Sequence, residues 1–95
     1  MTELVADIGG TNCRFALASD GQLLEGSFWQ CENNDYPTFD AALSEYLQTC
    51  DTPKRACFAA AGPIIGDTVK LTNHPWTIRA NALPDTQVTL LNDLQ

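Results

Sequence analysis

Two adjacent glycines near the start of the chain lie between two apolar runs, and this pattern constrains the fold more than any other. Leu4–Ile8 leads into Gly9-Gly10, and Cys13–Ala18 follows. Both runs are rich in residues that favour strands, and Gly-Gly is a common connection in a β-hairpin. The sequence therefore predicts two antiparallel strands joined by a tight turn.

The turn also has the composition of an anion-binding loop. The segment holds a carboxylate, two glycines and a hydroxyl, in the order Asp7, Ile8, Gly9, Gly10, Thr11 and Asn12. Glycine reaches positive φ without strain and lets the backbone approach a ligand, and successive N–H groups form a nest for phosphate. A carboxylate beside such a nest implies a cation between them, so Asp7 predicts Mg²⁺ held directly or through water.

Taken alone, the turn fits a plain hairpin better than a phosphate site. A Walker loop needs Gly-x-x-x-x-Gly-Lys followed by Ser or Thr, and a dinucleotide fingerprint needs a third glycine and a following helix. The segment after Asn12 has neither pattern and reads as a second strand. Support for a phosphate site has to come from the rest of the chain.

Composition narrows the class of protein. Ninety-five residues make one small domain, residues 1–95, and the net charge is −7. This charge argues against nucleic acid and against an anionic membrane surface as partners. No apolar run is long enough to cross a bilayer, and the amino terminus lacks the features of a signal peptide, so we expect a cytoplasmic protein.

The four cysteines are expected to be reduced and structural. Cys13, Cys31, Cys50 and Cys57 include no pair separated by two residues, and His74 is the only histidine, so a zinc site is not predicted. Disulfides are rare in the cytoplasm, and a free thiol in an apolar run packs as a small hydrophobic group.

A third strand and a helix are expected next. Leu24–Gln30 follows a turn at Asp20-Gly21 and predicts a third strand of an antiparallel meander. One helical face is then formed by Phe39, Leu43, Tyr46 and Leu47. Pro37 suits the start of this helix, Asp35 or Thr38 can cap it, and Thr52-Pro53 is expected to end it.

The second half of the chain predicts further strands. Arg55–Ala61 is an apolar run whose position after the helix favours a strand parallel to the first. A short strand is expected through Val69 and Leu71, a helical turn over residues 79 to 83, and a last strand at Val88–Leu91. The predicted fold class is α/β, with a mixed sheet, partly antiparallel and partly parallel, and a flanking helix.

Polar residues after the last strand are candidates for catalysis. Asn92 and Asp93 follow Val88–Leu91, and ligands of open α/β sheets collect beyond the carboxyl ends of parallel strands. Asp93 can take a proton from a substrate hydroxyl while the amide of Asn92 positions an alcohol or sugar. A helix cap is the alternative role for Asp93, and spacing alone does not separate the two.

The loop Thr72–Trp76 is dense in polar groups. It can line a polyol pocket with Trp76 as an apolar wall for a sugar ring, or it can simply bury Trp76 in the core. We interpret His74 as a surface or hydrogen-bonded core histidine in preference to a ligand-binding one.

Four ordered motifs resemble those of bacterial glucokinases, which belong to the superfamily of hexokinases, actin and heat-shock chaperone ATPases. They are Asp7-Ile8-Gly9-Gly10-Thr11-Asn12 with Arg14; Gly62-Pro63-Ile64 with Gly66-Asp67; Thr72-Asn73-His74-Pro75-Trp76; and Leu91-Asn92-Asp93. The resemblance covers essentially the whole chain. It implies the ribonuclease H-like amino-terminal lobe of an ATP-dependent hexose kinase.

The resemblance also implies roles for individual residues. By this resemblance, Asp7 is expected to lie by Mg²⁺ and the phosphates of ATP, with Gly9, Gly10 and Thr11 around the polyphosphate. Asn92 is expected to hold glucose, and Asp93 is expected to be the base that deprotonates its 6-hydroxyl. Asn73 and the Gly62-Pro63 loop are expected to shape the sugar side of the cleft.

Family members continue well past the Asn-Asp motif, so we expect this polypeptide alone to lack kinase activity. The resemblance is compatible with a homodimer of the full-length protein. A non-catalytic sugar- or nucleotide-sensing module of the same fold is the alternative function. A chaperone or cytoskeletal ATPase lobe shares the glycine turn but does not explain Asn92-Asp93 together with Thr72–Trp76.

Overall fold

The computed structural model describes residues 2–49, 52–72, 74–83 and 85–92. It consists of strands, one 3-10 turn and one α-helix. The elements in chain order are β1 (Thr2–Ile8), β2 (Asn12–Ser19), β3 (Gln22–Leu23), β4 (Trp29–Glu32), η1 (Asn33–Asp35), α1 (Phe39–Leu47), β5 (Arg55–Ala60), β6 (Ile64–Ile65), β7 (Thr68–Lys70), β8 (Thr77–Arg79) and β9 (Gln87–Asn92).

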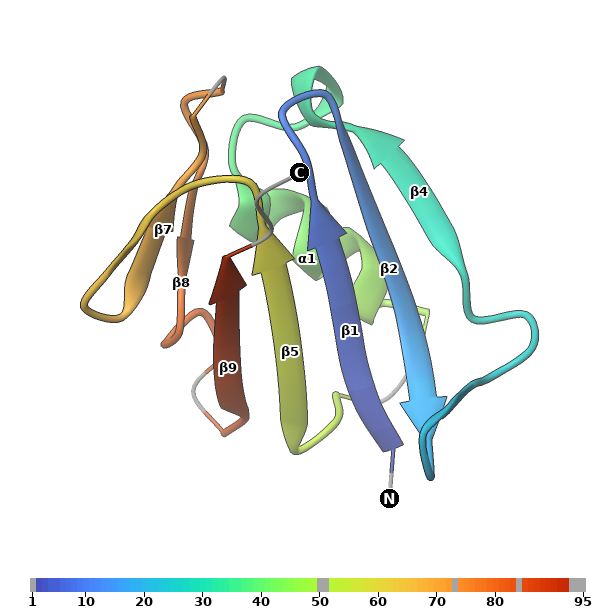
Figure 1. The fold of residues 1–95 in the computed structure, drawn as a ribbon. Coiled ribbons are helices and arrows are strands. Elements are labelled where there is room, and N and C mark those ends of the chain that lie inside the picture. Colours follow the sequence, from blue (N-terminus) through green and yellow to red (C-terminus); the bar gives the residue numbers. More distant parts are fainter. Residues whose placement is uncertain (1, 50–51, 73, 84, 93–95) are drawn as a thin grey trace.

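The main sheet is mixed, as the sequence predicts. Its strand order is β3-β2-β1-β5-β9, and β4 also pairs with β2 (Figure 1). β1 is antiparallel to β2 and parallel to β5, which is parallel to β9. The antiparallel meander, the parallel crossover through α1 and the last parallel strand are all confirmed.

One face of the sheet is buried under α1, which lies behind the sheet in Figure 1. Leu4, Ala6 and Ile8 alternate along β1 toward this face and are buried. Phe15 of β2 stacks on Phe39 and Tyr46 of the helix, with ring centroids 5.8 Å and 5.1 Å apart. Aromatic packing therefore fixes the helix on the sheet.

The helix begins as predicted and ends earlier. Thr38 is the N-cap, and its hydroxyl oxygen accepts a hydrogen bond from the Ala41 N–H at 3.1 Å. The helix ends at Leu47, well before the expected stop at Thr52-Pro53. The Thr49 hydroxyl donates to the Tyr46 carbonyl at 2.7 Å, so a side chain satisfies a carbonyl of the last turn and helps the helix to end there.

The predicted third strand, Leu24–Gln30, is wrong in its bounds. Pairing with β2 is interrupted between β3 and β4, where Gly26 has a φ of 82°. The hydroxyl of Ser27 accepts from the Leu17 N–H at 3.0 Å and donates to the Leu24 carbonyl at 2.6 Å. A side chain thus replaces the strand pairing at this point, and the chain bulges out before β4 begins.

A small second sheet, order β6-β7-β8, lies beside β9 (Figure 1). The strand expected through Val69 and Leu71 is present as β7 but ends at Lys70, one residue before Leu71, whereas β6 and β8 are additional. Residues 79–83 form no helix, which corrects the sequence-based expectation. Arg79 pairs with Thr68 as the last residue of β8, so the start of the expected helix is already held in a strand.

The face of the main sheet opposite α1 is open in the described part of the chain. Leu23, Phe28 and Leu91 are 66%, 62% and 48% exposed, respectively. None of the described helical segments is long and apolar enough to cross a membrane.

Candidate functional site

The candidate site is centred on the connection between β1 and β2, which we call the glycine turn (Gly9–Asn12). The Gly9 N–H donates to the Asn12 carbonyl at 2.9 Å and closes a hairpin with Gly10 and Thr11 at its tip. Within the described residues, no hydrogen bond involves the N–H groups of Gly10 and Thr11. Two adjacent donors at the tip therefore remain for an anion.

A hollow of about 260 Å³ lies against the turn, lined by Asp7, Gly9, Gly10, Thr11, Asn12 and Arg14. Asp7 and Arg14 are opposed on β1 and β2, and the Arg14 Nη1 lies 3.9 Å from the Asp7 Oδ2. About half of each side chain is exposed. Arg14 thus places a cation beside the Gly10 and Thr11 N–H groups. The sequence analysis included Arg14 in the first motif but gave it no role.

Glycine at the turn is not required by backbone conformation, contrary to the reasoning from sequence. Among the described residues positive φ occurs at Asp20, Gly21, Gly26 and Gly66, and not at Gly9 or Gly10. A Cβ added at Gly9 would make an ordinary contact of 3.5 Å with the Asn12 carbonyl oxygen. The chain itself can accept a side chain at Gly9, so any need for glycine there comes from a ligand.

A Gly9→Ala variant should therefore change ligand binding much more than it changes the stability of the fold. We expect its free energy of unfolding to change by less than about 1 kcal/mol, because the methyl group fits and φ is not strained. We expect its affinity for inorganic pyrophosphate to fall at least about tenfold, because the methyl group enters the hollow. Thermal unfolding and calorimetric titration check the two parts, and unchanged pyrophosphate affinity contradicts the assignment.

Asn33 holds the glycine turn from the side and was not identified from sequence. Its side-chain Nδ2 donates to the Gly9 carbonyl at 2.7 Å, and its backbone N–H donates to the Thr11 carbonyl at 2.8 Å. The residue is fully buried, and its Oδ1 has no hydrogen-bond partner among the residues that the structure describes. The first residue of η1 therefore clamps both sides of the tip, across 24 positions in sequence that leave no local signal.

Removing the clamp should loosen the turn. In Asn33→Ala the Gly9 carbonyl loses its side-chain donor, so we expect a loss of about 1–3 kcal/mol in the free energy of unfolding. We also expect faster hydrogen exchange at the Gly10 and Thr11 amides. The neighbouring Asn34→Ala, on an exposed residue, is the control and should leave this exchange unchanged. Equal exchange in both variants means that Asn33 does not position the turn.

The predicted site residues that the structure describes lie along one edge of the sheet. The register aligns Ile8 with Ala60 and Ala60 with Asn92, so β1, β5 and β9 end together. Two interstrand spacings, about 10 Å, separate Ile8 from Asn92. Asn92 is exposed at this edge, whereas Asp93 and Asn73 lie outside the described residues.

Asp7 and Asn92 occupy alternating rows of the sheet. Asp7 aligns with Ala59 and Leu91, on the face opposite α1, while Asn92 belongs to the row of Ile8. The side chain of Ile8 is fully buried, and its carbonyl accepts from the Ala61 N–H at 3.0 Å. Ile8 therefore anchors the turn to β5 from within the core.

The loop after β5 is held tightly against the second sheet. Gly62 is buried, and a Cβ at this position would lie 2.0 Å from the Lys70 carbonyl oxygen. The Thr72 N–H donates to the Ala61 carbonyl at 3.1 Å. Close backbone contact fixes where the Gly62-Pro63 loop leaves the edge of the main sheet.

Trp76 packs in the core, the second of the two roles that the sequence allowed. It is 2% exposed, lies against Phe39 with ring centroids 6.0 Å apart, and donates from Nε1 to the Tyr36 carbonyl at 3.2 Å. His74 is hydrogen-bonded, as interpreted from sequence. Its Nδ1 accepts from the Trp76 N–H, so in the neutral tautomer Nε2 donates to Asn34 Oδ1 at 3.1 Å.

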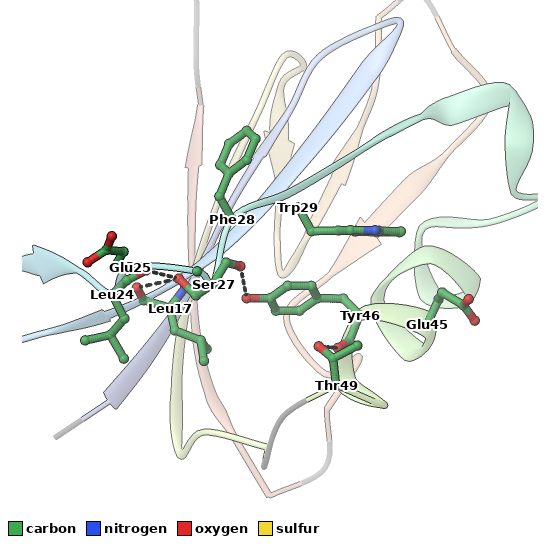
Figure 2. A pocket seen from close by; sticks show the side chains of 10 residues that line it. Leu17, Leu24, Glu25, Ser27, Phe28, Trp29, Glu45, Tyr46 and Thr49 are labelled. Atoms are coloured by element: carbon green, nitrogen blue, oxygen red, sulfur yellow. Dashed lines mark hydrogen bonds between the residues drawn. The ribbon is translucent and has the colours of Figure 1, made fainter.

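A larger hollow, of about 470 Å³, lies away from the edge, between α1 and the chain that leads into β4 (Figure 2). Trp29 and Tyr46 line it with the carboxylates of Glu25 and Glu45, and the Tyr46 hydroxyl donates to the Ser27 carbonyl at 2.7 Å. None of the described residues that line it carries a basic side chain. Carboxylates without a basic partner disfavour a phosphate, so size alone does not identify the site.

Mg²⁺ fits the glycine turn only when the protein and the phosphates of a substrate bind it together. No group of three or more His, Cys, Asp or Glu side chains that can hold a metal ion occurs among the described residues. Mg²⁺ usually keeps several waters and binds one or two carboxylates together with substrate phosphates. Asp7, half exposed beside the turn, suits that mode and does not form a protein cage by itself.

The mixed sheet, with a glycine turn between its first two strands and polar residues at the carboxyl edge, is that of the amino-terminal lobe of a sugar kinase. The family profile described as Glucokinase matches residues 4–95. The glucokinase of Brucella abortus biovar 1 (strain 9-941) is 38% identical over 98 residues, which cover 97% of this chain and 29% of the relative. The chain belongs to the glucokinase family.

Two further comparisons agree. The glucokinase of Stenotrophomonas maltophilia (strain R551-3) is 42% identical over 98 residues, covering 95% of this chain and 29% of the relative. A crystal structure of glucokinase from an Antarctic psychrotroph matches with a TM-score of 0.83 at 35% identity, covering 97% of this chain and 32% of that one. The chain spans about 29% of the length of these curated relatives.

Proposed function

We propose that this chain is the amino-terminal lobe of an enzyme that transfers the γ-phosphoryl group of ATP to the 6-hydroxyl of glucose. The observation that carries the proposal is the shared edge of β1, β5 and β9. The glycine turn, the Gly62-Pro63 loop and Asn92 all lie at this edge, in a chain that belongs to the glucokinase family. Ligands of α/β sheets bind at this edge.

The glycine turn is assigned to the polyphosphate. The N–H groups of Gly10 and Thr11 donate to phosphate oxygens, while Arg14 balances negative charge from the side. Gly9 and Asn12 close the turn, Ile8 anchors it, and Asp7 holds Mg²⁺ directly or through water. Bound Mg²⁺ supplies charge neutralisation of the phosphates, as in other phosphoryl-transfer enzymes.

The end of β9 is assigned to the sugar. Asn92, exposed at the edge, hydrogen-bonds glucose, and Asp93 accepts the proton of the 6-hydroxyl as that oxygen attacks phosphorus. Asn73 adds a polar contact to the sugar. Phosphoryl transfer depends mainly on positioning and charge stabilisation, so one carboxylate of ordinary basicity is adequate for this step.

The test is a coupled assay of the full-length protein with ATP, Mg²⁺ and a panel of hexoses, in a buffer that reproduces cytoplasmic conditions. We expect ATP-dependent formation of glucose 6-phosphate, which requires Mg²⁺, and no turnover by the 95-residue chain alone. Tight sugar or nucleotide binding by the full-length protein without phosphorylation would instead support a sensing module of the same fold. Turnover by the isolated chain would contradict the division of the site between two parts of the protein.

A further inference from the structure

Cys13 and Cys31 face each other on neighbouring strands directly below the glycine turn. They are paired in the antiparallel register of β2 and β4, and both are free thiols. Residues opposed in this way project to the same side of the sheet, here the core side that also carries Phe15 and Trp29. The two thiols are close enough for each to affect the pKa of the other.

The ladder gives the spacing of the pair. The Asn33 N–H donates to the Thr11 carbonyl, so Thr11 and Asn33 are a hydrogen-bonded pair, and Cys13 with Cys31, two positions along, is one as well. Such pairs have Cα atoms about 5.5 Å apart, within the range of about 4.4–6.8 Å found for disulfides. The two cysteines are therefore close enough to be joined.

We propose that Cys13 and Cys31 are an oxidisable dithiol that a low-molecular-weight disulfide converts into a protein disulfide at the base of the glycine turn. Cys31 is half-buried and Cys13 fully buried, so Cys31 reacts first. Its thiolate attacks one sulfur of the oxidant and expels the other as a thiolate. Cys13, losing its proton, then attacks the Cys31 sulfur and expels the second oxidant thiolate. The two protein thiols lose two electrons and two protons, and the oxidant becomes two thiols.

The reaction should be slow at neutral pH and faster in alkali. Burial, together with the nearby Asp35 carboxylate, raises the pKa of Cys31, and burial raises the pKa of Cys13 further. A raised pKa lowers the fraction of thiolate, which is the reacting form. Below the pKa this fraction increases roughly tenfold for each pH unit, and the rate should follow it.

We expect formation of the disulfide to displace the glycine turn. In a hydrogen-bonded pair the Cβ atoms are about 5.5 Å apart, whereas a disulfide needs about 3.5–4.5 Å, so the strands must move together by about 1 Å. Asn12 adjoins Cys13 and Asn33 is two residues after Cys31, so both sides of the turn are displaced. We expect the KM for ATP to rise at least threefold while the KM for glucose changes less; this second readout rests on the proposed function.

The primary test is chemical and does not depend on activity. The folded chain is incubated with glutathione disulfide at pH 7 and pH 9, the remaining thiols are blocked with N-ethylmaleimide, and the protein is digested with trypsin and Glu-C. Cleavage after Arg14, Glu32 and Lys54 puts each cysteine in its own peptide. We expect a cross-linked pair of peptides containing Cys13 and Cys31, formed faster at pH 9.

Matched variants isolate the pair. Cys31→Ser should abolish the cross-link, while Cys57→Ser, which removes a half-buried thiol on the other face of the sheet, should leave it unchanged. Blocked but unlinked Cys13 and Cys31, or a predominant link of either to Cys50 or Cys57, overturns the proposal. If the Cys13–Cys31 disulfide forms and the KM for ATP is unchanged, the proposed effect of the disulfide on the glycine turn is overturned, but the assignment of the two cysteines as an oxidisable dithiol stands. That assignment does not depend on the proposed function.

Discussion

Replacing Asp93 by Asn in the full-length enzyme should lower kcat by about 10²–10⁴-fold, the usual contribution of a general base. The amide has nearly the same shape as the carboxylate but cannot accept the proton of the 6-hydroxyl. Glucose binding should change little, because Asn92 and the rest of the sugar contacts remain. Steady-state kinetics give kcat, and calorimetric titration gives the dissociation constant for glucose.

Asp85→Asn is the matched control for this experiment. Asp85 is exposed in the turn that leads into β9, at the opposite end of the strand from Asn92. The same change of one carboxylate to an amide should therefore leave kcat within about twofold. If Asp93→Asn also stays within this range, the base has been assigned to the wrong residue.

Gly62→Ala should be more destabilising than the addition of a methyl group at Gly9, Gly21, Gly26 or Gly66. The new Cβ would lie 2.0 Å from the Lys70 carbonyl oxygen and 2.9 Å from its carbon. Both neighbours are backbone atoms, so the loop after β5 and the strand β7 must separate. Overpacking of this kind costs about 3 kcal/mol, which corresponds to a fall of roughly 12–24 °C in Tm for a domain of this size.

Two other glycines separate the clash from backbone strain. Gly66 has a φ of 64° and open space around its Cβ position, so Gly66→Ala should cost only about 1 kcal/mol, from conformation. Gly9 has neither a clash nor a positive φ, so Gly9→Ala should be nearly neutral. Thermal unfolding should rank the losses as Gly62, then Gly66, then Gly9. A Gly62→Ala protein as stable as the parent contradicts the close packing of the two sheets.

Local periodicity was sufficient for the main elements. The alternation along β1, the Gly9-Gly10 turn and the helical spacing of Phe39, Leu43 and Tyr46 each predicted an element that the structure contains. These patterns are local because burial on one face repeats every two residues in a strand and every three or four in a helix. The short strands β6 and β8 have two and three residues, which is too few for any period to be visible.

The interruption of the predicted third strand depends on a contact between distant residues, which the periodicity of apolar residues does not reveal. The Ser27 hydroxyl satisfies the Leu17 N–H, ten residues earlier in the chain. Leu24–Gln30 has the composition of a strand, but a side-chain hydrogen bond replaces the ladder there. Trp76 shows the same limit, since its polar neighbours allowed a ligand wall or a core residue, and only its packing on Phe39 decided between them.

The placement of the candidate site residues could be predicted in part, for the same reasons. The glycine turn and the position of Asn92 follow from local motifs and from the rule that parallel strands end at one edge. The Asn33 clamp and the position of Arg14 opposite Asp7 depend on strand pairing. The freedom of glycine to reach positive φ, which the sequence analysis gave as one advantage of Gly9-Gly10, is not used at either residue.

The most direct test of the central claim is a crystal structure of the full-length protein with glucose and a nonhydrolysable ATP analogue. The account predicts phosphate oxygens within hydrogen-bond distance of the Gly10 and Thr11 N–H groups, about 3 Å, and the 6-hydroxyl of glucose beside Asp93 at the end of β9. Phosphates bound away from the glycine turn, or glucose bound at another edge of the sheet, would contradict it.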